Sequence, residues 1–180
     1  MPGATFLSGD VVDLCNVEEE DLEFVTEGVN DPDVRVPLGI AQPRNQKQHE
    51  EWFEEEVSSD DDLTLLIVAR ETGEPAGLIR SNWMNERHGH AILSCWLAAD
   101  AQSQGYGTDA TRTLVDYLFE ERRMQTVRAE AYAFNEKSNA LLESIGMRHV
   151  GTLPNWAFVG GEHHDSNVYA VTREQWWDDQ

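Results

Sequence analysis

The segment of this sequence best suited to chemistry is a glycine-containing turn between an apolar run and a helical pattern. It follows the run His90–Leu97 and reads Gln102-Ser103-Gln104-Gly105-Tyr106-Gly107-Thr108. Glycines let the backbone curve so that successive N–H groups point outward. A helix N-terminus adds about half a positive charge, so such a turn can hold a pyrophosphate without lysine or arginine. The alternative interpretation is a plain strand–helix connection that binds nothing.

Two better-known phosphate motifs are absent from this turn. No Gly-Lys-Ser/Thr sequence follows, which excludes a Walker loop. The third glycine of the dinucleotide fingerprint is also missing at the required spacing. The turn therefore has to be interpreted from the elements on either side of it.

Hydrophobic periodicity predicts those elements. Strands are expected at residues 11–17, 63–69, 76–83, 90–97 and 126–134, with closing strands at 147–153 and 166–172 around a turn at Gly160-Gly161. Helices are expected at residues 18–29, 45–57, 105–123 and 135–145, and the proline-containing segment 30–43 is expected to be a loop. The three strands within 63–97 should form an antiparallel meander. The strand–helix–strand unit 90–134 should place two parallel strands side by side.

Composition bounds the class of protein. The chain has 180 residues, 40% of them hydrophobic, which predicts one globular domain spanning residues 1–180. No apolar run approaches the ~20 residues of a membrane span, and the N-terminus lacks a signal pattern. Two cysteines exclude a disulfide scaffold or a multi-cysteine zinc site. A cytoplasmic protein without membrane contacts is expected.

The charge of the chain is extreme. Asp and Glu total 34 against 13 Lys and Arg, which gives a net charge of −21. Such a chain repels nucleic acid at ordinary salt. The scarcity of lysine and the even spread of acidic residues resemble proteins of salt-accumulating organisms, in which high salt screens self-repulsion. A surface that attracts basic partners is the alternative.

The turn also carries a family resemblance. Gln102-x-x-Gly105-x-Gly107 matches the Gln/Arg-x-x-Gly-x-Gly/Ala motif of the GNAT superfamily of N-acetyltransferases, and it lies between a strand and a helix as theirs does. Further motifs resemble the RimJ/RimL-like branch, which acetylates the N-termini of ribosomal proteins. They are Asn135-x-x-Ser138, Gly146-Met147, Gly151 and Asp165-x-x-x-Tyr169. The likeness in element order spans residues 10–173.

This resemblance implies an α/β (α+β) fold. Its mixed central sheet would have about seven strands, helices on both faces, an antiparallel first half and a splayed parallel strand pair. It also implies acetyl-CoA as co-substrate, with no metal. The binding residues would be Cys95, Trp96, Leu97, Gln102, Gln104, Gly105, Tyr106, Gly107, Thr108, Asn135 and Ser138. Backbone amides of the turn would hold the pyrophosphate, and the strand before it would pair with the pantetheine arm. Asn135 is equally well explained as a helix N-cap.

The catalytic groups are less well marked. Many acetyltransferases of this class carry a tyrosine seven residues after the asparagine, proposed to protonate the leaving thiolate, and this chain has Leu142 there. Ser138, or a water molecule, is the replacement that we expect. The candidate bases are Glu130 and His90, followed by Asp165 and Glu162, and each has a surface or structural role as its alternative. The runs His163-His164-Asp165 and His88-x-His90 could suggest a metal site, but no His-Glu-x-x-His motif or cysteine pair supports one, so these histidines are expected to lie in a turn or a strand.

The expected activity is acetyl transfer from acetyl-CoA to a primary amine by direct attack in a ternary complex. The acceptor would be a peptide N-terminus, such as that of a ribosomal protein, or a small molecule such as a polyamine, antibiotic or amino acid. A non-catalytic acyl-CoA-binding module is a further alternative, favoured by the missing tyrosine. The protein would be a monomer or a homodimer.

Overall fold

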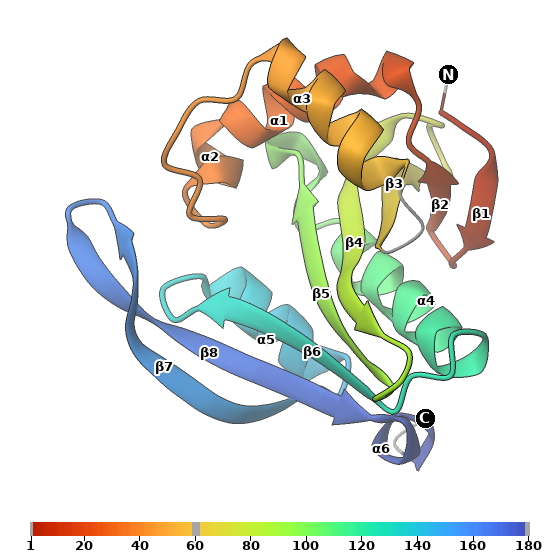
Figure 1. The fold of residues 1–180 in the computed structure, drawn as a ribbon, viewed down its shortest axis with the longest axis vertical. Helices are drawn as coiled ribbons and strands as arrows, with labels where there is room; N and C mark the ends of the chain where they lie inside the picture. Colours follow the sequence, from red (N-terminus) through yellow and green to blue (C-terminus); the bar gives the residue numbers. More distant parts are fainter. Residues whose placement is uncertain (1, 59–61, 179–180) are drawn as a thin grey trace.

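A single mixed sheet organises the chain in the computed structural model, which describes residues 2–58 and 62–178 (Figure 1). Its eight strands run in the order β1-β2-β3-β4-β5-β6-β8-β7. They are β1 (Thr5–Ser8), β2 (Val12–Asn16), β3 (Leu63–Ala69), β4 (Pro75–Asn85), β5 (His90–Leu97), β6 (Thr126–Tyr132), β7 (Arg148–Val159) and β8 (Glu162–Thr172). The β5–β6 pair is parallel and the other pairs are antiparallel. The expected mixed fold is confirmed, and β1 is the additional strand.

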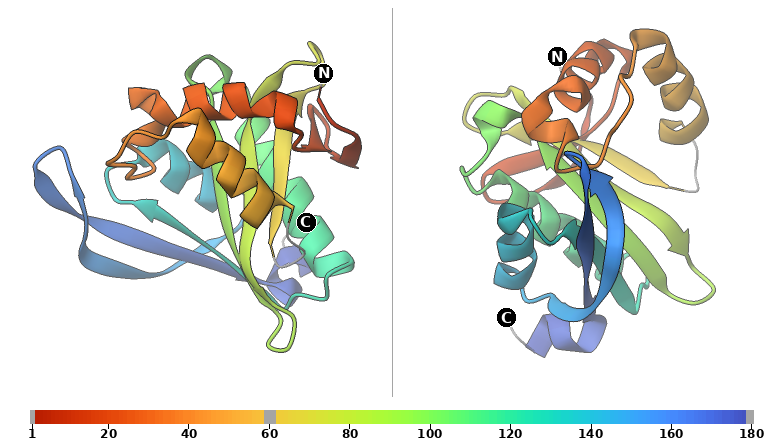
Figure 2. Two further views of the ribbon diagram at one scale, coloured as in Figure 1. Left: turned by 45° about the horizontal axis from the view of Figure 1, so that its top comes forward. Right: turned by 90° about the vertical axis from the view of Figure 1, so that its left-hand side faces the viewer.

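Helices cover both faces of the sheet (Figure 2). One face carries α4 (Tyr106–Glu120) and α5 (Glu136–Ser144), and α6 (Arg173–Asp178) follows the last strand. The other face carries α1 (Leu22–Asn30), α2 (Pro32–Arg35) and α3 (Gln46–Trp52). The turn η1 (Glu19–Asp21) precedes α1, and the π-helical turn η2 (Phe53–Val57) continues α3. The sheet is therefore the middle layer.

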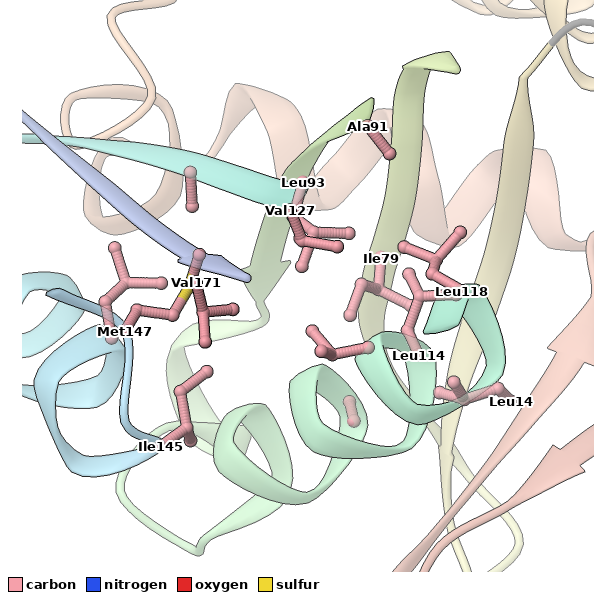
Figure 3. Close-up of a cluster of buried hydrophobic side chains, with 14 of the residues drawn as sticks. Leu14, Ile79, Ala91, Leu93, Leu114, Leu118, Val127, Ile145, Met147 and Val171 are labelled. Atoms are coloured by element: carbon pink, nitrogen blue, oxygen red, sulfur yellow. The ribbon is translucent and has the colours of Figure 1, made fainter. Parts of the chain in front are cut away.

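Alternating side chains divide the core between these two faces. On the α4 side, Leu114 and Leu118 pack with Leu14, Ile79 and Val127 in the larger cluster (Figure 3). The smaller cluster on the α1 side includes Cys15, Val25, Leu66 and Leu78, and Trp96 packs against it. Each fully buried leucine or valine contributes about 1.5–3 kcal/mol of transfer free energy. These two clusters fix β2–β5 between the helices of the two faces.

Strands β5 and β6 separate part of the way along their length. They pair only from His90↔Thr126 to Leu93↔Ala129. Beyond that point β5 stays bound to β4, and β6 stays bound to β8. The parallel pair is thus splayed, and the splay opens a gap in the middle of the sheet.

The chain departs from expectation in two regions. The segment 30–43, expected to be a loop, contains the short helix α2, because Asp31 caps it and Pro32 fits its first turn. The closing strands extend to Arg148–Val159 and Glu162–Thr172, so the hairpin projects from the body as an arm (Figure 1). A register shift lies between Leu153 and Ala157. There the Asp165 carboxylate accepts the Asn155 N–H over 2.8 Å, which stabilises the irregularity.

Candidate active site

The glycine turn presents unpaired backbone donors. Gly105 is the N-cap of α4 and has a φ of 85°, in the left-handed region where glycine is favoured. The Asp109 N–H bonds the Gly105 carbonyl over 3.0 Å. Within the described part of the chain, the N–H groups of residues 105–108 have no hydrogen-bond partner. The start of α4 is therefore free to bind an anion.

The edge of β5 next to the splay offers further donors. The Ala98 N–H bonds the Ala76 carbonyl on β4, and bonded residues alternate along an antiparallel pair. In this register Trp96 faces β4 with its backbone groups, whereas Cys95 and Leu97 direct theirs toward the gap. An extended ligand can therefore pair with Cys95 and Leu97 as an additional strand.

Hydrogen bonds from Gln102 and Lys137 hold the last residue of β5, Leu97, in place. Gln102 Nε2 donates to the Leu97 carbonyl over 3.3 Å, and Lys137 Nζ donates to Gln102 Oε1 over 3.0 Å. This chain of contacts connects the start of α5 to the last residue of β5. It occupies the Leu97 carbonyl and leaves the Leu97 N–H available.

The first turn of α5 forms the opposite wall. Asn135 Oδ1 accepts the Ser138 N–H over 3.2 Å, so Asn135 is the N-cap of α5. Both residues also line the cleft described below, so capping and ligand binding are compatible at Asn135. Leu142 is buried in the core cluster below α4 and α5 and carries no proton donor.

A cleft of about 950 Å³ passes through the splay and joins these parts. Among the residues expected from the sequence, it is lined by Cys95, Trp96, Leu97, Gln102, Gly105, Gly107, Thr108, Glu130, Asn135 and Ser138. Gln104 and Tyr106 do not line it. The Gln104 side chain donates to the Asp100 carbonyl, and Tyr106 packs against the core. We therefore expect Gln104 and Tyr106 to contribute to ligand binding through their backbone N–H groups and not through their side chains.

The structure does not bring three of the candidate bases to the cleft. His90 begins β5, at the end opposite Leu97, and its ring stacks on His88 with centroids 6.2 Å apart. Asp165 is committed to the arm through Asn155, and Glu162 lies near the tip of that arm. Glu130 alone of the four lines the cleft, and its carboxylate lies 3.2 Å from Arg128 Nη2.

Sequence reasoning missed the wall on the α2 side. Asp33, Val34, Pro37 and Leu38 line the cleft there, as does Phe134 after β6. The capping signal Asp31-Pro32 could have indicated α2, but nothing in the sequence says that this segment lies over the splay. The cleft therefore has one side toward α4 and α5, where the glycine turn lies, and another side toward α2.

Cys95 lies in the cleft as an inert thiol. Burial raises its pKa to about 12, so it stays protonated at neutral pH and is a poor nucleophile. Among the described residues, no group of three or more His, Cys, Asp or Glu could hold a metal ion. In the same part of the chain, no helix is long and apolar enough to cross a membrane.

The fold and this site together define an acyl-CoA-binding acetyltransferase. The family model for the acetyltransferase (GNAT) domain matches residues 12–148, so the chain belongs to the GNAT family. It is an acetyl-CoA-dependent N-acetyltransferase, and acetyl-CoA is its co-substrate. The free amides of the glycine turn and the open edge of β5 are compatible with that molecule.

The individual proteins that this chain resembles share only part of its sequence. The chain is 32% identical over 104 residues to YdaF of Bacillus subtilis (strain 168), a protein named for ribosomal N-acetyltransferase activity, and the match spans 58% of this chain and 57% of YdaF. It is 22% identical over 171 residues to the prophage-derived N-acetyltransferase YokL of the same organism, covering 95% of each. A spermidine N-acetyltransferase from Vibrio cholerae, solved with CoA and spermine, superposes with a TM-score of 0.85 at 18% identity. That superposition covers 92% of this chain and 98% of the other.

Proposed function

We propose that the enzyme acetylates the N-terminal amine of a protein, such as a ribosomal protein, by direct attack in a ternary complex. The observation that carries this proposal is the passage through the sheet, with free amides on one side and the Glu130 carboxylate toward the other. The likeness to YdaF supports the choice of acceptor. It also supports placement in the RimJ/RimL-like branch.

The residues divide the chemistry between them. Backbone N–H groups of residues 105–108 hold the pyrophosphate, and Asn135 binds the pantetheine. The Leu97 N–H polarises the thioester carbonyl, as an oxyanion-hole donor does. Glu130, directly or through one water molecule, takes the proton that the amine loses as its C–N bond forms. The C–S bond then breaks, and Ser138 or a water molecule gives a proton to the departing thiolate.

The identity of the amine decides how much base catalysis is needed. An α-amine with a pKa near 7.7–8.0 is ~10% neutral at pH 7, whereas a lysine amine near 10.4 is only ~0.04% neutral. An N-terminal amine therefore demands little from Glu130. A weak base is enough for such an amine, and Glu130 is suited to that role because its carboxylate also forms an ion pair with Arg128.

A polyamine is the second candidate acceptor. The carboxylates of Asp33, Glu130 and Glu136 line the cleft, and a polycationic amine would be attracted to them. The shared fold with the spermidine N-acetyltransferase is compatible with this choice.

An acceptor screen tests the proposal. The protein is incubated with acetyl-CoA and either N-terminal peptides of ribosomal proteins or spermidine, and the free thiol is measured. Thiol release with the peptides and acetylation of their α-amine are expected. Release with spermidine alone would select the second candidate, and release with neither would contradict both. Glu130→Gln should slow transfer without changing the Kd for CoA.

The proposal extends to the setting of the enzyme. We propose a cytoplasmic enzyme of a salt-rich cell, with one domain over residues 1–180 and a monomeric or homodimeric state. The net charge of −21 supports the salt-rich setting, and the two free cysteines support the cytoplasmic one.

A further inference from the structure

Ser94 lies at the point where the two parallel strands part. The last β5–β6 pair is Leu93↔Ala129, so Ser94 and Glu130 are the first residues beyond it on each strand. Leu93 belongs to the cluster under α4, whereas Trp96 packs with the cluster under α1. Because side chains alternate along a strand, Ser94 and Glu130 share the α1–α2 face. Both line the cleft.

Asn82 on β4 holds the Ser94 hydroxyl. Its Nδ2 donates to Ser94 Oγ over 3.2 Å. A serine hydroxyl has two acceptor lone pairs and one donor proton, so the contact with Asn82 uses one lone pair and leaves a second available. Asn82 Oδ1 is buried without a hydrogen-bond partner among the described residues.

Ser94 lies next to the part of β5 where we propose that the thioester binds, so its hydrogen bond with Asn82 can serve catalysis. The next residue, Cys95, directs its backbone groups into the gap, as Leu97 does, and these groups are the donors available to an acyl-pantetheine chain. An amine arriving from the α2 side reaches Ser94 Oγ and the Glu130 carboxylate before it reaches that edge. Two acceptors on one side of the nitrogen would direct its lone pair toward the carbonyl carbon.

We propose that Ser94 orients the acceptor amine by accepting one of its N–H groups, and that Asn82 is a positioning residue acting through Ser94. This inference rests on the proposed amine acetylation but not on which amine is used. Holding reactants in an attack geometry is one of the largest sources of rate enhancement. Ser94 exchanges no proton in this role, and the bonds made and broken are those of the transfer itself.

The test compares Ser94→Ala, Ser94→Thr, Asn82→Ala and the double variant Ser94→Ala/Asn82→Ala, with acetyl-CoA and either spermidine or an N-terminal peptide as acceptor. Loss of one hydrogen bond should lower kcat/KM for the amine by about tenfold in Ser94→Ala, mostly in kcat, with an unchanged Kd for CoA. Ser94→Thr keeps the hydroxyl and should restore activity to within about threefold. The double variant should be no slower than Ser94→Ala, because Asn82 acts through Ser94.

Ser81→Ala is the matched control, because Ser81 is the neighbour of Asn82 and its hydroxyl is buried without a partner. It should leave the kinetics of both acceptors unchanged. The role of Ser94 is overturned if Ser94→Ala stays within about twofold of the parent, if Ser94→Thr fails to restore activity, or if the two single effects multiply. A parent enzyme that releases no thiol with either acceptor would overturn the proposed function together with this inference.

Discussion

Two properties of Gly105 leave room for a ligand beside its backbone. Its φ of 85° is one that residues with a side chain rarely adopt. A Cβ built on Gly105 would meet no heavy atom within 4 Å, so the backbone faces open space in the cleft. What distinguishes Gly105 from the other exposed glycines is its position in the cleft beside the free N–H groups of residues 105–108, where we propose that the pyrophosphate binds.

Gly105→Asp should therefore abolish acetyl-CoA binding and leave the fold intact. A carboxylate about 4 Å from a phosphate is opposed by about 4 kcal/mol at an effective dielectric constant of 20. Calorimetry should show a Kd raised at least about a hundredfold. Gly73→Asp is the control, because Gly73 also has a positive φ, 73°, with no heavy atom within 4 Å, but lies outside the cleft. An unchanged Kd in Gly105→Asp would remove the phosphate-turn assignment.

Substitution of Cys95 tests whether the reaction forms a covalent acetyl-cysteine intermediate. Burial raises the pKa of its thiol to about 12, so the thiol stays protonated as the pH rises from 7 to 9 and no thiolate forms. Cys95→Ala should keep kcat within about threefold, and the parent thiol should react slowly with iodoacetamide over that range. A trapped acetyl-cysteine, or a variant without activity, would indicate a covalent route in place of direct attack.

At the scale of elements, the sequence predicted the strands and turns that depend on residues within the same segment. The alternation of Val127, Ala129 and Ala131 predicted β6, and the turn at Gly105 was recognised from its glycines. Strand β1 was missed because Thr5–Ser8 is too short to show a period and pairs only with β2. The α2 wall of the cleft was missed because its position depends on how Val34 packs over a distant splay. His90 does not line the cleft because it is the first residue of β5, seven residues before Leu97 and therefore at the strand end opposite the glycine turn.

Strands β4 and β5 approach each other closely at Gly77. Gly77 pairs with Leu97, and a Cβ on Gly77 would overlap the Trp96 carbonyl oxygen. Gly77→Ala should displace the Trp96–Leu97 backbone, destabilise the protein by about 1–3 kcal/mol and weaken CoA binding. Denaturant unfolding and calorimetry would measure the two effects.

Gly151→Ala on β7 is the control for Gly77→Ala. Its Cβ would meet no heavy atom within 4 Å, so the change in stability should stay within about 0.5 kcal/mol. If Gly77→Ala were equally silent, the edge of β5 would not be held in place by this approach.

At the scale of the molecule, the net negative charge of the protein repels the negatively charged CoA. The protein carries −21, and CoA adds about four negative charges from its pyrophosphate and phosphomonoester. Lys137 lines the cleft, but its ammonium is engaged by Gln102. Asp33, Glu130 and Glu136 line the same cleft with the opposite charge. In the proposed mode of binding, short-range backbone donors hold CoA inside a repulsive long-range field.

Salt should separate these two contributions. The Debye length falls from about 10 Å at 0.1 M to about 3 Å at 1 M, which screens the distant carboxylates more than the amides in contact with phosphate. The Kd for CoA should therefore fall as KCl rises from low to molar concentration, opposite to the behaviour of sites built from lysine and arginine. Dephospho-CoA, which lacks the phosphomonoester, should show a smaller change. A Kd that rose steadily with KCl for both ligands would mean that cations, not backbone amides, hold the phosphates.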